Sequence, residues 1–250
     1  MEQPAQGSET AEGPGQRSEE QPPEEQGPGQ QRPGPAWQRR TRGEHRWPEA
    51  VIVALAIGLQ LALPDRMAPG QRYLLFALEV LLLAGLVVAN PFRLDRDSML
   101  LRAGGLSLTG LIGLSNGWSA VLLVQALILG RPISPTDLLT AGGAVWLTNV
   151  IAFALLYWEL DRGGPAARAA ALRDYPDFMF AQMQSPELAD PEWEPTFVDY
   201  LYLSFTNSTA FSPTDVLPLS RWAKMIMMVQ SGVALVVVLL VVARAVNVLS

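Results

Sequence analysis

The sequence has 250 residues, of which 49% are hydrophobic and 17% charged, and its formal net charge is −6. It contains no cysteine, which excludes disulfides and thiolate chemistry within this chain, and its single histidine, His45, lies in a polar segment. Basic residues are not clustered on a foldable segment, as a nucleic-acid-binding surface would require, so we expect no nucleic-acid partner.

Residues 1–48 have a composition of their own, made almost entirely of Pro, Gly, Gln, Glu, Ser and Arg. Such a segment cannot bury enough apolar surface to offset the entropy lost on ordering, so we predict a disordered N-terminal tail. Its end carries Arg39, Arg40, Arg42 and Arg46 just before the first apolar run. Arginines at that position favour contact with an anionic membrane surface.

Residues 49–130 predict a region of three transmembrane helices, formed by the apolar runs Trp47–Leu63, Tyr73–Ala89 and Leu100–Leu129. The first run lies too far into the chain for an ordinary signal peptide, and we expect it to be retained as a span. The third run would be roughly 45 Å long as one helix, which predicts a tilted span.

Residues 131–250 predict a second membrane module with a different order of elements. Its parts are a transmembrane helix over 138–160, an acidic linker over 161–195, a re-entrant helix over 196–210, a filter-like loop over 211–218 and a last transmembrane helix over 221–249. The predicted fold class is therefore all-α: a polytopic membrane protein with about five transmembrane helices and one re-entrant, pore-like helix.

The segment 196–210 is predicted to be re-entrant because of its length and its polar end. A helix of that length spans about 22 Å, which is short of the roughly 30 Å hydrocarbon core. Its last turn, Thr206 to Thr209, is Thr-Asn-Ser-Thr, which lipid would not tolerate. A helix that enters partway and returns as an extended strand solves both problems, provided that protein or water surrounds the strand.

This order of elements resembles the pore domain of tetrameric potassium channels, in which a span, a re-entrant helix, a T-V-G-Y-G-D filter, a Pro and an inner helix follow one another. The matching filter residues here are Ala210, Phe211, Ser212, Pro213, Thr214 and Asp215, and Pro218 and Trp222-Ala223-Lys224 lie at the family's offsets. The resemblance covers roughly residues 138–249. It implies a homotetramer in the lipid bilayer of a cell membrane, acting as an ion channel for monovalent cations.

The filter itself departs from the family, since Ser212 and Thr214 stand in place of its glycines and Pro213 in place of its aromatic residue. A carbonyl cage for K⁺ needs backbone angles open mainly to Gly, and Pro fixes φ near −65°. We therefore expect weak cation selectivity from a wider, hydrated constriction. The alternative is a non-conducting membrane scaffold or interaction protein that keeps a channel-like fold.

The candidate site residues fall into two groups. The predicted pore and filter residues are Thr206, Asn207, Ser208, Thr209, Ala210, Phe211, Ser212, Pro213, Thr214 and Asp215, and the intramembrane polar residues are Glu79, Gln125, Asn149 and Gln230. Asp215 forms either a charged ring or a brace for the last helix. Asn207 either lines the pore or satisfies buried backbone, and Glu79 either pairs with a buried polar group or takes part in transport. The three amides are expected to hydrogen-bond between helices.

We expect no enzyme activity, no cofactor and no metal, because the linker carboxylates lack a metal-like spacing and have neither a base nor a nucleophile near them. The orientation is ambiguous. Arginine counting places the N-terminus in the cytoplasm, and with five spans the re-entrant helix then enters from that side, opposite to the family. A break at residues 115–117 would make six spans and restore the family orientation, at the cost of two short halves.

Overall fold

The computed structural model describes residues 34–65, 72–92, 94, 98–210 and 215–249. The helices are α1 (Trp47–Leu61), α2 (Arg72–Ala89), α3 (Met99–Ile128), α4 (Pro135–Leu160), α5 (Pro165–Ala169), α6 (Ala181–Gln184), α7 (Phe197–Thr209) and α8 (Arg221–Leu249), with short 3-10 turns η1 (Ala36–Gln38), η3 (Asp161–Gly163) and η4 (Pro186–Leu188). Two short strands, β1 (Phe178–Met179) and β2 (Leu217–Pro218), complete the described part. The all-α class is confirmed.

Three helical stretches in the described part are long and apolar enough to cross a membrane. They are Met99–Ile128, Pro135–Gly163 and Arg221–Arg244, of 30, 29 and 24 residues. Helices of these lengths extend about 36–45 Å, more than the hydrocarbon core requires. Helix α1 and residues Tyr73–Ala89 of α2 are apolar but shorter. Length and composition therefore support a membrane protein with three candidate spans.

Helix α3 runs without a break through Ser115, Asn116 and Gly117. The single long helix expected there is therefore confirmed, and the alternative with two half-length spans is wrong. Ser115 and Asn116 are buried, so these polar residues face neighbouring helices and do not open the α3 backbone.

Helix α4 begins and ends with local signals that its sequence carries. Ser134 caps its start by accepting a hydrogen bond from the Asp137 backbone N–H at 3.0 Å, and Pro135 occupies the first turn. At its end, Arg162 has a φ of 52° and is followed by Gly163 and Gly164 with φ of 90° and 99°. This left-handed run stops the helix and turns the chain into the linker.

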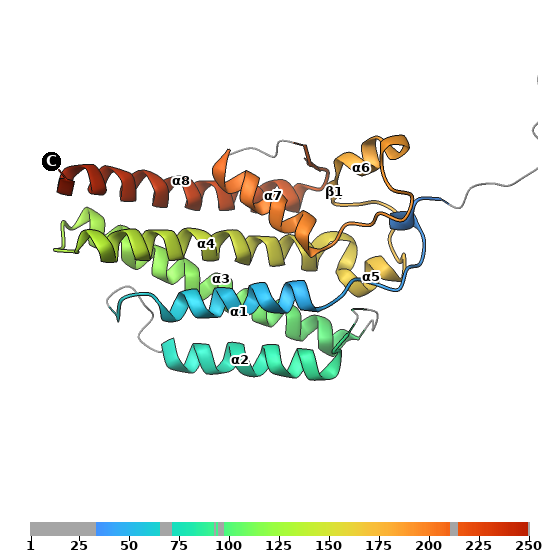
Figure 1. Cartoon of the computed structure of the whole chain (residues 1–250), viewed down its shortest axis with the longest axis horizontal. Helices are drawn as coiled ribbons and strands as arrows, with labels where there is room; N and C mark the ends of the chain where they lie inside the picture. The colour runs from blue at the N-terminus through green and yellow to red at the C-terminus, as the bar shows by residue number, and fades with distance from the viewer. Residues whose placement is uncertain (1–33, 66–71, 93, 95–97, 211–214, 250) are drawn as a thin grey trace, which may run out of the picture. The chain divides into compact units, whose positions relative to one another are not determined.

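Helix α4 is the centre of the packing, because it contacts α1, α3, α7 and α8 (Figure 1). The buried core has two parts. One lies toward the linker end and contains Tyr157, Trp158, Phe197 and Tyr200, and the other surrounds Val145. The large aromatic residues of the core thus gather where α4 ends and α7 begins.

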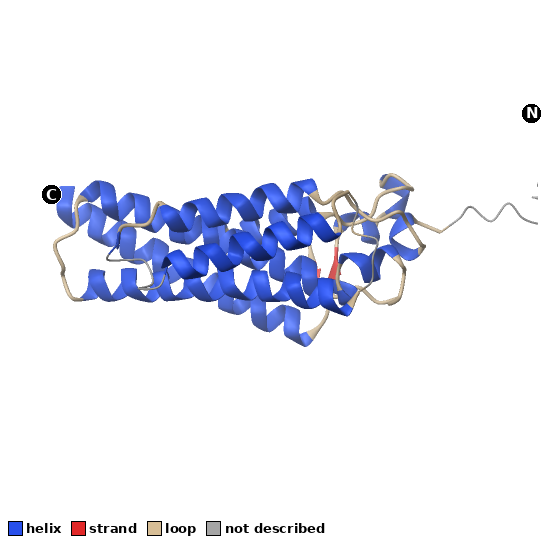
Figure 2. Ribbon diagram, turned by 90° about the horizontal axis from the view of Figure 1, so that it is seen from below, coloured by secondary structure: helices blue, strands red, loops and turns tan. Residues whose placement is uncertain are grey.

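Helix α7 starts at the linker end, and the chain returns to that same end before α8 begins (Figure 1). Strand β2, just before α8, pairs antiparallel with β1 of the linker, with Phe178 opposite Pro218 and Met179 opposite Leu217. Figure 2 shows this strand pair among the loops at the linker end. The 13 residues of α7 are about 20 Å long, so α7 does not run the length of its neighbours α4 and α8.

Gly142 on α4 provides a test of the contact between α4 and α8. A Cβ added at Gly142 would stand 2.7 Å from Cγ2 of Val241, whereas one at Gly143 would meet nothing within 4 Å. Both substitutions gain the same helix propensity, about 1 kcal/mol for Ala over Gly. We expect Gly143→Ala to raise the unfolding temperature in detergent. The unfolding temperature of Gly142→Ala should lie below that of Gly143→Ala. Equal unfolding temperatures would contradict this packing.

Candidate functional site

The polar face of α7 points into the protein. Ser204, Asn207 and Ser208 lie at spacings of three and four residues, which places them on one side of the helix. All three are buried, with at most 2% of their surface exposed. Buried polar side chains need hydrogen-bond partners, so the elements on either side of α7 must supply them.

Gln230 of α8, which is completely buried, is the central partner of this face. Its Nε2 donates to the Ser204 carbonyl at 3.0 Å, to Ser204 Oγ at 2.6 Å and to Ser208 Oγ at 2.8 Å. Its Oε1 accepts from Asn207 Nδ2 at 2.8 Å and from the Tyr157 hydroxyl at 2.5 Å. One amide therefore joins α7, α8 and α4, and we call these five residues the Gln230 cluster.

Further hydrogen bonds extend the Gln230 cluster into the backbone of both neighbours. Ser204 Oγ donates to the Val150 carbonyl of α4 at 2.6 Å. Asn207 Nδ2 donates to the Met227 carbonyl of α8 at 3.1 Å, and Ser231 Oγ donates to the Asn207 carbonyl at 3.2 Å. The Asn207 side chain therefore provides a hydrogen bond to a backbone carbonyl of α8.

The other face of α7 is apolar and exposed in the single chain. Val198, Tyr202 and Phe205 are 58%, 49% and 47% exposed. The hydroxyls of Thr206 and Thr209 donate back to carbonyls of their own helix, at 3.0 Å to Tyr202 and 2.9 Å to Phe205. Helix α7 therefore has an internally bonded side and a largely exposed side, on which Phe205 packs edge-to-face against Trp146 of α4 with 5.8 Å between the ring centres.

The loop after α7 is described only in part. Ala210 is exposed and closes α7, and the expected filter residues Phe211, Ser212, Pro213 and Thr214 lie outside the described residues. Asp215 is exposed, and its carbonyl accepts a hydrogen bond from Gln184 Nε2 at 3.4 Å. Asp215 therefore lies beside α6 of the linker, near the start of α8.

The start of α7 is held by Glu44, a residue that precedes α1. Glu44 Oε2 accepts the Phe197 backbone N–H at 2.7 Å, and Oε1 accepts Trp158 Nε1 at 2.5 Å and Arg168 Nη2 at 3.3 Å. A capping box between Thr196 and Asp199 satisfies further first-turn groups. A carboxylate at this position also interacts favourably with the helix dipole.

Glu44 was not predicted as a functional residue. The Thr196–Asp199 capping pattern can be recognised in the sequence, but nothing in it points to a partner 153 residues away. Burial raises the pKa of Glu44, although the Arg168 charge and the hydrogen bonds from Phe197 and Trp158 oppose that change.

Arg168 of α5 contacts both Glu44 and the end of α4. It donates from Nη1 to the Trp158 carbonyl at 2.5 Å and to the Asp161 carbonyl at 3.0 Å, and its guanidinium lies 5.0 Å from the centre of the Tyr200 ring. Burial alone would lower the pKa of Arg168, but the fields of Tyr200, Glu44 and Asp161 hold it above its ordinary value. Arg168 is therefore a permanent cation at the end of α4.

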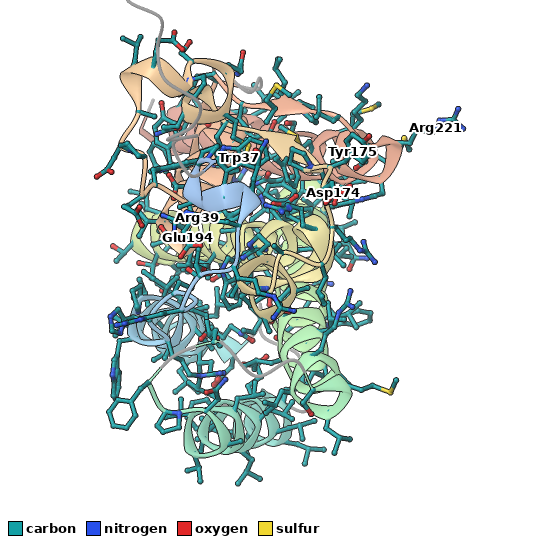
Figure 3. All side chains as sticks on the ribbon, turned by 90° about the vertical axis from the view of Figure 1, so that its right-hand side faces the viewer. Trp37, Arg39, Asp174, Tyr175, Glu194 and Arg221 are labelled. Carbon is teal, nitrogen blue, oxygen red and sulfur yellow. The ribbon has the colours of Figure 1, made fainter. Side chains whose placement is uncertain are left out.

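Asp177 joins the linker to the start of α8. Its Oδ1 accepts Trp222 Nε1 at 2.9 Å, and its carbonyl accepts the Leu219 N–H at 2.8 Å. Its backbone N–H donates to Asp161 Oδ1 at 2.8 Å, and Asp161 Oδ2 accepts the Tyr200 hydroxyl at 2.5 Å. Figure 3 looks at this end of the protein, with Trp37 and Arg39 over its middle and Tyr175 and Arg221 toward one edge.

The other residues that we predicted as intramembrane polar groups form no hydrogen bond to the Gln230 cluster among the described residues. Glu79 of α2 accepts from Gln60 Nε2 at 3.1 Å, and Ser115 Oγ donates to Gln60 Oε1 at 2.5 Å. Asn149 is buried with its Nδ2 unpaired among the described groups. Gln125 is exposed on α3, beside a groove against α8. Each therefore belongs to a different part of the bundle.

No group of three or more His, Cys, Asp or Glu side chains in the described ranges could hold a metal ion. Comparison with protein-family models, with curated proteins and with solved structures found no match. A functional conclusion for this chain therefore depends on its own geometry.

Replacing Gln230 tests the central cluster. Gln230→Leu keeps the volume but leaves the buried hydroxyls of Tyr157 and Ser208 without this partner, at about 1–3 kcal/mol each. We expect unfolding in mixed micelles to become easier by about 2 kcal/mol or more. Gln125→Leu, at an exposed position, is the control and should change stability little. A stable Gln230→Leu variant would show that the cluster does not hold α7.

Replacing Glu44 tests the anchor at the start of α7. In Glu44→Ala the Phe197 N–H loses a charged acceptor, a hydrogen bond of about 1.5–3 kcal/mol. We expect amide exchange in the first turn of α7 to accelerate about tenfold or more, as measured by hydrogen exchange with mass spectrometry. Glu192→Ala removes an exposed carboxylate paired with Arg39 and should leave α7 unchanged. Identical exchange in both variants would rule out the anchor.

Proposed function

We propose that this protein is an integral membrane ion channel, or a channel-like protein, with an atypical filter and weak cation selectivity. The observation that carries the proposal is the course of α7. This short helix packs between α4 and α8, starts at the linker end, and is followed by a chain that returns to that end at β2. In a membrane this is the course of a re-entrant pore helix between an outer and an inner span.

In the proposed arrangement α1, α2, α3, α4 and α8 span the bilayer. The four helices α1 to α4 bring the chain back to its starting side. In agreement, the Thr41 N–H donates to the Ala169 carbonyl at 2.9 Å and the Ala36 N–H to the Pro191 carbonyl at 3.0 Å. The segment before α1, the linker and the start of the re-entrant helix α7 would then lie on the same side of the membrane.

The proposed assembly is a homotetramer around the loop that follows α7. Tyr202 and Phe205 of α7 and Met225 and Met228 of α8 are exposed apolar residues that neighbouring copies would cover. A closed ring of identical subunits has repeated contacts of this kind. It would also remove the exposed polar end of α7, including Thr209, from lipid.

The proposed pore lining starts later in the chain than the sequence alone suggests. Asn207 and Ser208 are used inside the subunit by Gln230, so the lining would consist of Thr209 and residues 211–214, with a ring of Asp215 at the mouth. Residues 211–214 contain no glycine. We therefore propose a hydrated constriction with hydroxyl and carboxylate groups in place of a carbonyl cage.

One observation favours a second function, a non-conducting scaffold. The Gln230 cluster satisfies the polar face of α7 within one chain, so α7 is stable without water or ions beside it. A protein of this kind could keep the fold for assembly alone. The two functions differ in whether purified protein carries current.

Planar-bilayer recording of the purified full-length protein tests the channel. We expect a cation current with a K⁺/Na⁺ permeability ratio far below the value on the order of 100 that a carbonyl cage gives. Asp215→Asn should lower the conductance at low salt and have less effect at high salt, where screening is strong. Glu187→Gln, an exposed linker carboxylate, is the matched control for loss of one negative charge.

Three outcomes would count against this proposal. A K⁺/Na⁺ ratio on the order of 100 would contradict the hydrated constriction. A protein that stays monomeric in lipid, with no crosslink between subunits through Thr209→Cys, would exclude the tetrameric channel. A tetramer without current at any voltage, pH or lipid composition would support the scaffold.

A further inference from the structure

A small cavity at the linker end has no residue of α7 in its wall. It has a volume of about 50 Å³ and lies among the end of α2, the start of α3 and the end of α4, with residues 163–167 on one side. In a bilayer this level, where the long helices end, is the level of the lipid head groups. None of the proposed pore residues line the cavity.

The cavity is lined by charges of both signs. Arg46 and Arg102 supply guanidinium groups and Glu159 a carboxylate, and Asn90 and Ser98 add neutral polar groups. Arg46 and Glu159 are 5% and 7% exposed, whereas Arg102 is exposed. The side chains at the cavity wall thus offer two cations and one anion to whatever enters.

Arg46 is incompletely bonded. Its Nε is buried and has no hydrogen-bond partner among the described groups. Glu49 Oε2 lies 3.8 Å from it, which gives an ion pair but exceeds hydrogen-bond distance. Glu49 is buried behind Arg46 and is not part of the cavity wall. Arg46 also lines the cavity, and a buried guanidinium with a single carboxylate beside it keeps unused donor capacity, so an oxyanion in the cavity would be stabilising.

Glu159 reaches its position because residue 105 has no side chain. A Cβ added at Gly105 would stand 2.2 Å from Glu159 Oε1, closer than atoms can approach. Glycine therefore lets the carboxylate lie against the α3 backbone, at the edge of the cavity. Among the described residues the Glu159 carboxylate accepts no hydrogen bond, which leaves it as an acceptor for a cationic donor in the cavity.

A cavity wall that offers guanidinium groups and a carboxylate at separate positions is complementary to a molecule that carries both an anionic and a cationic group. We propose that this cavity binds the zwitterionic head group of an aminophospholipid such as phosphatidylethanolamine. Arg46 and Arg102 bind its phosphate, and Glu159 accepts hydrogen bonds from its primary ammonium. Leu86 and Leu101, also in the cavity wall, contact the apolar part of the lipid. The proposal requires membrane residence but not ion conduction.

Other head groups fit this chemistry less well. A phosphatidylglycerol head group supplies the phosphate but no cation for Glu159. A phosphatidylcholine head group carries a quaternary ammonium, which donates no N–H hydrogen bond to Glu159. The site should therefore distinguish among the three by the primary ammonium, not by net charge.

Native mass spectrometry of delipidated full-length protein, titrated with short-chain forms of the three lipids, tests the proposal. We expect phosphatidylethanolamine to bind about tenfold more tightly than the other two, the effect of one charge-assisted hydrogen bond. Glu159→Gln should abolish this preference, and Arg102→Gln should lower the affinity for all three lipids about threefold. Arg131→Gln, an exposed position at the opposite end, should change nothing.

The outcomes separate the proposal from its rivals. Equal affinity for the three lipids, or a preference that survives Glu159→Gln, overturns it. Soluble phosphoethanolamine that binds as tightly as the lipid shows a site for a free zwitterion and overturns the lipid assignment. Because Arg102 is exposed, Arg102→Gln should fold even if Glu159→Gln does not, and unchanged lipid binding by Arg102→Gln then decides against the site. These measurements need no current, so failure of the channel proposal leaves them valid.

Discussion

Hydrogen-bonding groups removed from water must find partners, and this constraint governs the part of the chain around α7. A helix of 13 residues with serine, asparagine and threonine in its last two turns could not persist in an apolar bundle without them. Gln230 satisfies the inner face, and Glu44 with the Thr196–Asp199 capping box satisfies the first turn. The position of α7 between α4 and α8 depends on both sets of hydrogen bonds.

Several elements could be predicted because their signals are local. The apolar runs indicated α1, α2, α3, α4 and α8, and the polar end of the 196–210 segment set it apart from a span. The partners could not be predicted in the same way. Whether Asn207 faces a pore or Gln230 depends on the rotation of α7 against α8, and periodicity alone does not specify that rotation.

Arginine counting illustrates the same limit. Such counting gives equal weight to every arginine beside a span, but the structure buries Arg162 and Arg168, and both donate hydrogen bonds to backbone carbonyls. Arg168 satisfies carbonyls at the end of α4, where a cation is favoured by the free C=O groups and the helix dipole. Residue type thus identified a basic end of the bundle, but only the fold separates structural cations from those facing lipid or solvent.

The long separation between Glu44 and Phe197 also has a consequence for biogenesis. The ribosome makes Glu44 before any of the long helices, and its acceptor role at α7 arises 153 residues later. Trp158 and Arg168, which hold the same carboxylate, are made in between. The first turn of α7 therefore becomes secured only after α4 and the linker have folded back onto the segment before α1. The contacts of Glu44 at this end of the protein are therefore completed only when the chain has been made as far as Phe197.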